Sequence, residues 1–291
     1  GINVTNVGSW LEWNNASNNI VQNSWFTGPV GAFTASSFLD SHRNKFLKNT
    51  FQNSAGDSMT FFRSDYNLIE GNTFIDANHS LMTLKCGDFN VVRGNTFSNA
   101  RQKGSEVFDC DINEPGVLVN QLDSTKHNLI EGNVFSLTAA NDGGGPYSGI
   151  QYAGQNGIIR QNAFYNNRGR GLDLTVYTGE AQNNRSNRVY NNVFYSNTNG
   201  FATSAGTTQV FSDNVIKNNI LYKNIRMALP WNDNKLGGSQ MDNNAVAGFK
   251  FEYNNVFNNQ AGENGTIQTG FVDRTLAQAQ SQYPATYSNN V

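Results

Sequence analysis

The chain has 291 residues, which is enough for a large core in one or two domains. Its formal net charge is −2 and only 14% of its residues are charged, so nothing points to nucleic acid or an acidic membrane surface as a partner. No apolar run reaches about 18 residues, which excludes a candidate membrane-spanning helix in this sequence.

About one residue in six is asparagine, and glycine is also abundant. A polar, weakly charged composition of this kind often belongs to disordered chains. Here an aromatic content of 12% and a clear apolar periodicity predict a folded chain instead. The two cysteines, Cys86 and Cys110, form neither a zinc motif nor a disulfide framework.

A short motif recurs along the chain: Asn, any residue, an apolar residue, two of any kind, Asn, any residue, an aromatic. It is clearest in NLIEGNTF (67–74), NVVRGNTF (90–97) and NLIEGNVF (128–135). Its second Asn falls at Asn23, Asn49, Asn72, Asn95, Asn133, Asn162, Asn192 and Asn219. Two residues later come Trp25, Phe51, Phe74, Phe97, Phe135, Phe164, Phe194 and Leu221, and three residues earlier come Ile20, Phe46, Ile69, Val92, Ile130, Ile159, Val189 and Ile216. A ninth copy, FEYNNVF at 251–257, is out of phase by one residue.

Each copy predicts a short strand, an Asn turn and a second short strand, because its apolar residues recur at i and i+2. A third strand with the same alternation follows, at 58–61, 81–84, 149–152, 171–174 and 200–203. Three short strands per repeat of 20–40 residues predict an all-β fold, a single right-handed parallel β-helix of about nine to ten coils. It would cover 1–270, with 271–291 as a C-terminal extension or cap. A tandem array of separate modules is the alternative, but no single copy could bury its own aromatic residue.

Coils of a β-helix stack at about 4.8 Å, so equivalent positions form columns. Stacked phenylalanines would fill the interior, and stacked asparagines would form amide ladders. Cys86 and Cys110 would stack as small inward residues on neighbouring coils, and a disulfide between them is the alternative. The turns outside the ladder tolerate insertions, which explains the uneven spacing of the motif.

The predicted insertions flank the third strand, at 98–106, 111–127, 136–148, 177–187, 204–214 and 231–249, and would wall a groove. Alternation assigns Met59, Phe61, Met82, Leu84, Phe108, Cys110, Ile150, Tyr152, Leu172 and Leu174 to the interior. It assigns Thr60, Thr83, Lys85, Asp109, Asp111, Gln151 and Asp173 to the outer face, with Arg63, Glu106, Arg168 and Arg170 at strand ends. A row of charged side chains on consecutive coils predicts a substrate site, although a single outward Asp is usually only solvated.

Two chemistries fit this row. Asp109 or Asp111 lies two coils from Asp173, about 9–10 Å, at the upper edge of the carboxylate separation in inverting glycosidases. The same three carboxylates could instead hold Ca²⁺, with Lys85 or an Arg as base and charge stabiliser. Tyr147, Tyr177 and Trp231 are candidate platforms for sugar rings, or simple loop packing residues. His42, His79 and His127 are too scattered to predict a metal site.

The stretch RSDYNLIEGNTFIDANHSLMTLKCGDFNVVRGNTF, 63–97, resembles the catalytic region of β-helix polysaccharide lyases of the chondroitinase B and alginate lyase type. That family reads roughly Lys-Ser-x-x-Asn, then Asn-Thr-Phe, then Leu-Thr-Leu-Arg-His-Gly. Here Arg63 and Ser64 stand at the Lys-Ser, Asn67 at the Asn, and 72–74 at the Asn-Thr-Phe. Residues 82–87 stand at the last motif after a one-residue insertion, with Lys85 in place of the Arg and Cys86 in place of the His. In the preceding coil, 40–63, Asp40 takes the place of the Lys.

The resemblance implies a secreted or cell-surface enzyme in which a Lys removes the uronate C5 proton and an Arg assists. The Asn-rich coils also resemble the β-helix core of archaeal disaggregatase, which degrades a chondroitin-like cell-wall polymer. We therefore expect depolymerisation of an acidic, uronate-containing polysaccharide. The roles would be Lys85, Asp109, Asp111, Asp173 and Arg63 in catalysis, and Gln151, Arg168, Arg170, Tyr147, Tyr177 and Trp231 in substrate binding. A glycoside hydrolase with paired Asp residues and a non-catalytic glycan-binding module remain the alternatives.

Overall fold

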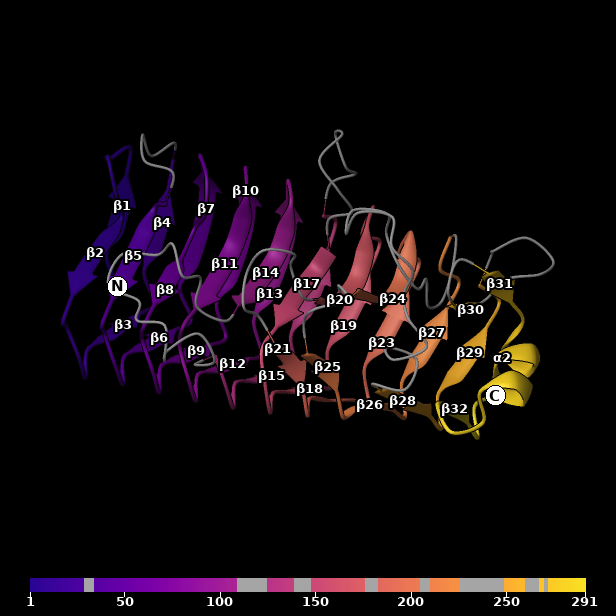
Figure 1. The fold of residues 1–291 in the computed structure, drawn as a ribbon. Coiled ribbons are helices and arrows are strands. Elements are labelled where there is room, and N and C mark those ends of the chain that lie inside the picture. The colour runs from indigo at the N-terminus through magenta and orange to yellow at the C-terminus, as the bar shows by residue number, and fades with distance from the viewer. Residues whose placement is uncertain are drawn as a thin grey trace.

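The computed structural model describes residues 1–28, 34–108, 125–138, 148–175, 183–204, 210–225, 249–259, 267–269 and 272–291. Short strands follow one another in groups of three, and each strand of a group joins a different parallel sheet. The chain thereby winds into an elongated parallel β-helix with its two ends at opposite tips (Figure 1). The predicted solenoid architecture is confirmed.

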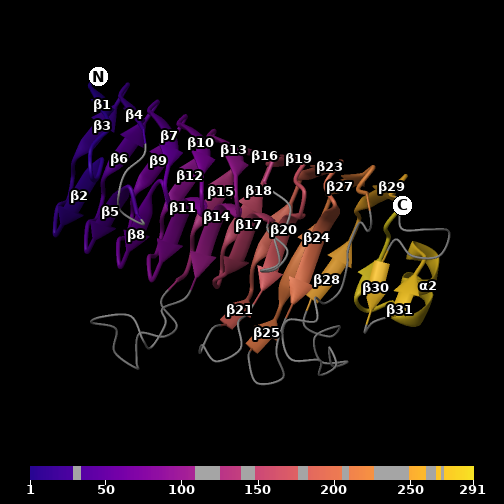
Figure 2. The same ribbon diagram turned by 90° about the horizontal axis from the view of Figure 1, so that it is seen from above.

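Three sheets form the walls of the helix (Figure 2). Sheet A has ten strands: β1 (Asn3–Thr5), β4 (Trp25–Thr27), β7 (Thr50–Ser54), β10 (Thr73–Ala77), β13 (Thr96–Ala100), β16 (Val134–Ser136), β19 (Ala163–Tyr165), β23 (Val193–Tyr195), β27 (Ile220–Tyr222) and β29 (Asn255–Phe257). Sheet B has eight: β2 (Leu11–Asn14), β5 (Ser36–Leu39), β8 (Thr60–Phe62), β11 (Ser80–Lys85), β14 (Lys103–Phe108), β17 (Ser148–Ala153), β20 (Arg170–Thr175) and β24 (Asn199–Ser204). Sheet C has ten: β3 (Ile20–Gln22), β6 (Lys45–Leu47), β9 (Leu68–Glu70), β12 (Val91–Arg93), β15 (Leu129–Glu131), β18 (Ile158–Arg160), β22 (Arg188–Tyr190), β26 (Asn214–Lys217), β28 (Phe249–Glu252) and β32 (Tyr287–Ser288).

Smaller elements complete the described part of the chain. A parallel pair is formed by β21 (Asn183–Arg185) and β25 (Val210–Ser212), and an antiparallel pair by β30 (Ile267–Thr269) and β31 (Val272–Arg274). Helix α2 (Leu276–Gln282) precedes β32. Among the described residues, no helix has the length and apolar character that crossing a bilayer would require.

A column of phenylalanine rings fills the interior beneath sheet A. Consecutive rings stack with centroids 4.7–5.1 Å apart in the series Phe26, Phe51, Phe74, Phe97, Phe135, Phe164 and Phe194. Each of these rings is at most 1% exposed. The spacing equals one strand step, so parallel pairing and ring stacking reinforce the same register.

An amide ladder runs beside this column, at the turn between sheets C and A. The Asn72 backbone N–H donates to Asn95 Oδ1 at 2.8 Å, and Asn72 Nδ2 donates to the same oxygen at 3.0 Å and to the Phe46 carbonyl at 2.8 Å. The pattern repeats through Asn49, Asn72, Asn95, Asn133, Asn162, Asn192, Asn219, Asn254 and Asn290. Each rung satisfies a buried backbone N–H, which is why Asn recurs at this position.

Two copies of the motif differ from the predicted phase. In the first, Ser24 rather than Asn23 takes the ladder position, since its N–H donates to Asn49 Oδ1. Accordingly Phe26 pairs with Phe51 and is fully buried, while Trp25 is 51% exposed. Val21, not Ile20, pairs with Phe46.

The ninth copy, predicted to be out of phase, is in register. Asn254 accepts from the backbone N–H of Asn219 and extends the ladder. Val256 pairs with Leu221 and Phe251 with Ile216, so each takes the position that the motif assigns.

A second amide ladder, at the turn between sheets B and C, is interrupted once. It runs through Asn19, Asn44, Asn67, Asn90 and Asn128, and resumes at Asn187 and Asn214. Gly157 occupies the missing rung and donates its N–H to Asn187 Oδ1. A Cβ at Gly157 would lie 1.8 Å from the Tyr152 hydroxyl oxygen, so the Tyr152 ring occupies the space of the missing amide. Tyr152 is fully buried, as predicted.

The interior assignments on sheet B hold except in β14. Met59, Phe61, Met82, Leu84, Ile150, Tyr152, Leu172 and Leu174 are all fully buried. In β14, however, Val107 pairs with Leu84 and Phe108 pairs with Lys85. The predicted phase, with Phe108 inward, is therefore wrong by one residue. The predicted insertion at 98–106 is also wrong, because β13 and β14 occupy most of it.

Cys86 is disulfide-bonded, which corrects the expectation of a simple stack of thiols. The residue is 5% exposed and follows β11 with a positive φ of 55°. Cys110 is the only other cysteine in the sequence and lies outside the described residues. The corner after β11 is therefore covalently anchored.

Candidate functional site

The outer face of sheet B is buried at β17 and β20, whereas the outer faces of sheets A and C are open. Every residue of β17 and of β20 is buried, including the outward Gln151 and Asp173. By contrast β23 of sheet A and β22 of sheet C expose outward residues and bury only the central one. In this part of the helix, sheet B is thus the wall whose outward side chains are withdrawn from solvent, while its first strands, β2, β5 and β8, keep exposed or half-buried outward residues.

Strand register arranges the outward positions of sheet B in rows along the helix axis. The central row contains Glu12, Ser37, Thr60, Thr83, Glu106, Gln151, Asp173 and Ala202. The amino-terminal row contains Ser80, Lys103, Ser148, Arg170 and Asn199. The carboxy-terminal row contains Leu39, Phe62, Lys85 and Phe108. Neighbours in a row are one strand step, about 4.8 Å, apart.

An ion pair joins the first two rows inside β20. Arg170 Nη1 lies 2.5 Å from Asp173 Oδ2, and both side chains are only 4% exposed. Beside them, Gln151 is 7% exposed, and its Oε1 has no hydrogen-bond partner among the described residues. Burying an ion pair costs several kcal/mol of desolvation, and buried carbonyl oxygens are normally paired. Buried charged and polar groups gathered on one face are a common feature of functional sites.

A His–Asp pair lies beside the central row at Thr60 and Thr83. His79 Nδ1 is 2.6 Å from Asp57 Oδ1, which also accepts from the Ser80 N–H at 2.9 Å. Asp57 Oδ2 accepts from the hydroxyls of Thr60 and Thr83, at 3.3 and 3.5 Å, and so connects the pair to the row. The Asp57 side chain is 7% exposed and the imidazole 24% exposed. A carboxylate held in this way fixes the orientation of an imidazole that solvent or a ligand can reach.

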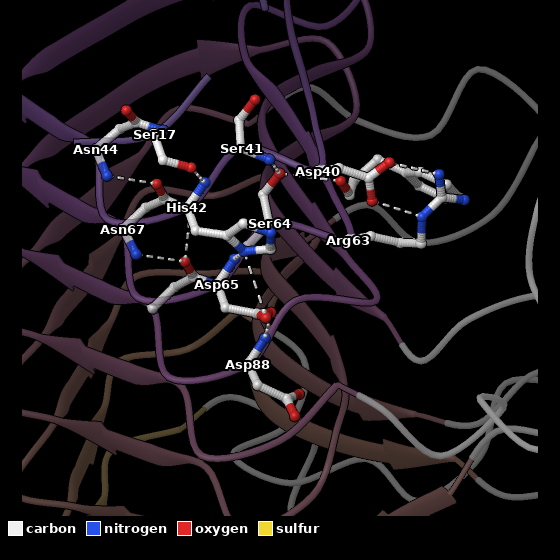
Figure 3. Close-up of polar contacts among 12 residues, drawn as sticks. Ser17, Asp40, Ser41, His42, Asn44, Arg63, Ser64, Asp65, Asn67 and Asp88 are labelled. Atoms are coloured by element: carbon white, nitrogen blue, oxygen red, sulfur yellow. Dashed lines mark hydrogen bonds and ion pairs between the residues drawn. The ribbon is translucent and has the colours of Figure 1, made fainter. Parts of the chain in front are cut away.

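The corner between sheets B and C carries a column of polar side chains (Figure 3). Ser17 Oγ accepts from the N–H of His42, His42 Nδ1 from that of Asp65, and Asp65 Oδ1 from that of Asp88. Asp88 Oδ1 in turn accepts from the N–H of Lys126 at 2.6 Å. Burial raises the pKa of Asp88 to about 6, with a smaller contribution from the negative charge of Asp65. These bonds hold one coil on the next, which accounts for the column without a ligand.

Arg63 lies at the edge of this corner rather than in a row. Its Nε and Nη2 donate to the two oxygens of Asp40 at 2.8 and 2.9 Å, as Figure 3 shows. These hydrogen bonds lower the pKa of the Asp40 carboxyl. The guanidinium also lies over the Phe62 ring, 4.8 Å from its centroid.

The structure places the remaining predicted site residues as follows. Lys85 is half-buried in the carboxy-terminal row, and Gln151, Asp173 and Arg170 cluster at β17 and β20. Arg168 is exposed before β20, and its carbonyl accepts from the Thr198 hydroxyl. Asp109, Asp111, Tyr147, Tyr177 and Trp231 lie outside the described residues, and with them most of the predicted Ca²⁺ site. Within the described segments, no group of three or more His, Cys, Asp or Glu side chains could hold a metal ion.

Four residues around these rows were not predicted from the sequence as site residues. Asp57 and His79 are 22 positions apart in turns, and only coil stacking brings them together. Lys103 and Glu106 occupy the amino-terminal and central rows of β14. The sequence does contain a signal for Lys103 and Glu106. Gly104 aligns with Gly149, the residue before Ile150, and this alignment sets the register of β14.

Comparison with known proteins supports the fold. A family model described as "Right handed beta helix region" matches residues 1–136. No curated protein matches the sequence. A solved structure of a double mutant of the periplasmic alginate epimerase AlgG overlaps with a TM-score of 0.53 at 11% identity, over 99% of this chain and 73% of that one. Another AlgG structure gives a TM-score of 0.51 at 11% identity, over 84% of this chain and 58% of that one, so the protein spans less than two thirds of its length.

A mutant tailspike protein of E. coli bacteriophage HK620, in complex with a pentasaccharide, overlaps less well, with a TM-score of 0.44 at 13% identity over 86% of this chain and 49% of that one. Identities this low establish the fold alone. The protein is a right-handed parallel β-helix, as its sequence repeat predicts.

Proposed function

We propose that the protein depolymerises an acidic polysaccharide bound along the outer face of sheet B. One observation carries the proposal: the buried Arg170–Asp173 pair beside Gln151, on a face that a soluble β-helix would otherwise leave solvated. Structure built only for stability seldom buries charges in this way, because apolar side chains would serve as well. Binding of a ligand to these groups would explain why they are buried.

The shape of the site suits a linear polymer. The three rows extend along the helix axis over successive coils, so an extended chain can contact the same positions repeatedly. Three cations, Lys85, Lys103 and Arg170, occupy these rows and favour a substrate with carboxylates. The substrate class that fits is a uronate-containing, chondroitin-like polymer. Similarity to a protein described as an alginate epimerase is in line with a polysaccharide substrate.

In the lyase form of the proposal, a cation neutralises the uronate carboxylate and makes the C5 proton more acidic. Arg63, whose backbone N–H donates to the Lys85 carbonyl from the neighbouring coil, is a candidate for this role, or Ca²⁺ held by Asp109, Asp111 and Asp173. Arg170 is three strand steps from Lys85 and would bind another sugar unit. Lys85 removes the proton, and Arg63 at the neighbouring corner assists. The electron pair left on C5 forms the C4–C5 double bond and expels the leaving sugar oxygen, which takes up a proton. Gln151, Arg168, Tyr147, Tyr177 and Trp231 would bind the neighbouring sugar units.

A hydrolase is the second candidate, and one register observation favours it. Glu106 and Asp173 share the central row and are two strand steps apart, about 9.6 Å. This lies at the edge of the separation of about 6.5–9.5 Å that leaves room for a water in inverting glycosidases. Glu106 and Asp173 are a candidate pair beside that of Asp109 or Asp111 with Asp173, which the sequence suggested and which lies partly outside the described residues.

The test is incubation of the protein with alginate, polygalacturonate and chondroitin, with and without a chelator. Ultraviolet absorbance of an unsaturated uronate together with new reducing ends identifies a lyase. Reducing ends without that absorbance identify a hydrolase. Loss of activity with the chelator, restored by Ca²⁺, supports the metal role. If none of these polymers is shortened, depolymerisation is wrong and glycan binding without cleavage becomes the better hypothesis.

Substitutions locate the activity. Asp173→Asn keeps the size of the side chain but removes its charge, and we expect cleavage to fall at least about 100-fold, as for loss of a charged catalytic group. Glu70→Gln, on the outer face of sheet C, removes a carboxylate of the same helix away from sheet B and should leave activity unchanged. Equal activity of Asp173→Asn and the parent would contradict the location on sheet B.

We also propose that the protein works outside the cytoplasm. The disulfide at Cys86 supports this, because such bonds persist in oxidising compartments. An acidic polysaccharide of a cell wall or matrix is found in the same place. Detection of the oxidised bond in protein isolated from its native host, by thiol labelling before and after reduction, tests the point.

A further inference from the structure

A pocket of about 560 Å³ opens at the corner between sheets A and B, beside the rows described above. Asn53, Asp76, Asn78, Asn99 and Arg101 are among the residues that line it. Its volume is in the range of small-ligand sites, roughly 300–1,000 Å³. None of its lining residues is used by the proposed catalytic rows.

The corner at the pocket is built differently from the same corner in the second half of the helix. Three residues after the central core residue of each sheet A strand, the later coils carry Asn167, Asn197, Asn224 and Asn259, which form a third amide ladder. The earlier coils have Ser54, Ala77 and Ala100 at the same position, and these three pair with one another across β7, β10 and β13. Those strands are five residues long, whereas β16, β19, β23 and β27 are three. Small side chains replace the amides, and Ser54 and Ala77 form part of the pocket wall.

Polar side chains surround the space that these small residues leave. Asn53, Asp76 and Asn99 stack at one corner position, with positive φ angles of 64°, 58° and 59°. Asn99 Nδ2 donates to Asp76 Oδ1, which orients the carboxylate. Amide and carboxylate groups in such a set can donate to and accept from adjacent hydroxyls. The Arg101 guanidinium adds a fork-shaped group that matches a carboxylate.

The pocket adjoins the amino-terminal edge of sheet B. Asn78 of its wall is followed by His79, whose ring meets Asp57, and then by the start of β11. Arg101 is two residues before Lys103, the first residue of β14. A polymer unit seated in the pocket would therefore be next to the polar rows and not on a separate face.

From this geometry we infer that the pocket is a sugar-binding subsite that holds one hexuronate unit, such as a branch or a chain end. Asp76, Asn53 and Asn99 bind its ring hydroxyls and Arg101 its carboxylate. The inference rests on the proposed function for its substrate class. It adds a subsite outside the rows, which would give the site a preference for chains that carry a unit at this corner.

The test is calorimetric titration with hexasaccharides of alginate, polygalacturonate and chondroitin, using Asp76→Gly and Asn53→Gly. Glycine tolerates the positive φ at both positions, so the side chain is removed without backbone strain. Asn166→Gly is the matched control, because Asn166 has a φ of 55° at the same corner position where the third amide ladder fills the space. We expect Asp76→Gly to weaken binding about tenfold, as expected for one lost charge-assisted contact, while Asn166→Gly changes it less than about twofold.

Three results would overturn the subsite: binding by Asp76→Gly equal to the parent, equal losses in Asn166→Gly, or no hexasaccharide bound by the parent. The outcome is separable from that of the proposed function. Cleavage by Asp76→Gly with the parent's KM removes the subsite but leaves depolymerisation in place. Binding that depends on Asp76 in a protein that cleaves none of these polymers retains the subsite and removes depolymerisation.

Discussion

The side chain of Asn95 shows how many hydrogen bonds one residue of the first amide ladder makes. Its Oδ1 accepts from the backbone N–H and the side-chain amide of Asn72, and its Nδ2 donates to Asn133 Oδ1 and the Ile69 carbonyl. Asn95→Ala would leave the Asn72 N–H buried without an acceptor, and we expect a loss of roughly 3 kcal/mol in the free energy of unfolding. Urea denaturation measures it. Thr96→Ala, the exposed neighbour, should change stability by less than about 0.5 kcal/mol, and equal losses in both variants would contradict this role of the ladder.

The raised pKa of Asp88 predicts a pH dependence of stability. Its folded-state pKa of about 6 exceeds the ordinary value of 3.8, so the folded protein holds this proton more tightly than the unfolded chain does. The contribution to stability is therefore fully present below about pH 4 and is lost as the pH rises through about 6. Asp88→Asn keeps the oxygen that accepts from the Lys126 N–H but carries no charge. Because solvent screens part of the effect at this half-buried site, we expect the variant to be about 1–2 kcal/mol more stable than the parent at pH 7.5.

The comparison between pH 4.5 and pH 7.5 is the decisive part of that measurement. Near pH 4.5 the parent carboxyl is largely protonated, so the two proteins should have similar urea midpoints. The difference between them should grow as the pH rises. A constant difference, or a variant that is less stable at pH 7.5, would show that the carboxylate of Asp88 is not destabilising.

At the scale of the element, the coil with the interrupted ladder makes a second kind of prediction. Gly157→Asn alone would drive the new side chain into the Tyr152 ring, so we expect a loss of more than about 3 kcal/mol. Tyr152→Leu matches Leu174, the residue paired with Tyr152 in the next coil, and removes the obstacle. In the double variant the new amide can join Asn128 to Asn187, so Gly157→Asn should cost at least about 2 kcal/mol less there. A double-mutant cycle by urea denaturation gives this coupling, and additive losses would contradict the exchange of amide for ring.

Strand positions and their columns were predictable because one physical constraint repeats. The ladder needs an Asn and the interior needs an apolar residue two positions later, and parallel stacking leaves no freedom of register between them. The phase failed where the sequence offers two neighbours of suitable type. Asn23 and Ser24 can both accept a hydrogen bond, and Trp25 and Phe26 can both fill a core. The structure places Asn23 at the positive φ of 51°, which Asn tolerates better than Ser does, and Ser24 in the ladder.

The candidate site was predictable only in part, because the phase of a strand is ambiguous where two neighbouring residues suit the same position. Alternation within β11, β17 and β20 identified Lys85, Gln151 and Asp173 as outward residues. The stretch KGSEVFDC (103–110), whose first six residues form β14, alternates acceptably in two phases, and the apolar Phe108 favoured the wrong one. The His79–Asp57 pair lies in turns, where no periodicity exists and only the stacking of two corners creates the contact.

For the whole molecule, the open end of the solenoid is the weak point. Parallel coils leave unpaired strand edges at the last turn, and such edges recruit other chains. Here the C-terminal segment covers that end: β32 pairs with β28, and Tyr287 is fully buried against Phe249 and Phe251. Asn290 supplies the last rung of the ladder, and its N–H donates to Gln280 Oε1 of α2 at 2.9 Å.

Deletion of 275–291 should therefore convert the protein from a cooperative unit into an aggregating one. The deletion removes the acceptor of the Asn254 N–H and exposes the edge of β28 together with Phe249 and Phe251. Gln280→Ala is the milder control, because it removes only the bond that fixes the final rung and should cost about 1 kcal/mol. Size-exclusion chromatography with light scattering, combined with thermal unfolding, distinguishes the two. We expect oligomers and a lowered Tm for the deletion and a monodisperse species close to the parent for Gln280→Ala. A deletion variant with the parent's size and Tm would show that the coils need no cap at this end. Each rung of the ladder would then contribute to stability independently, without depending on the last rung.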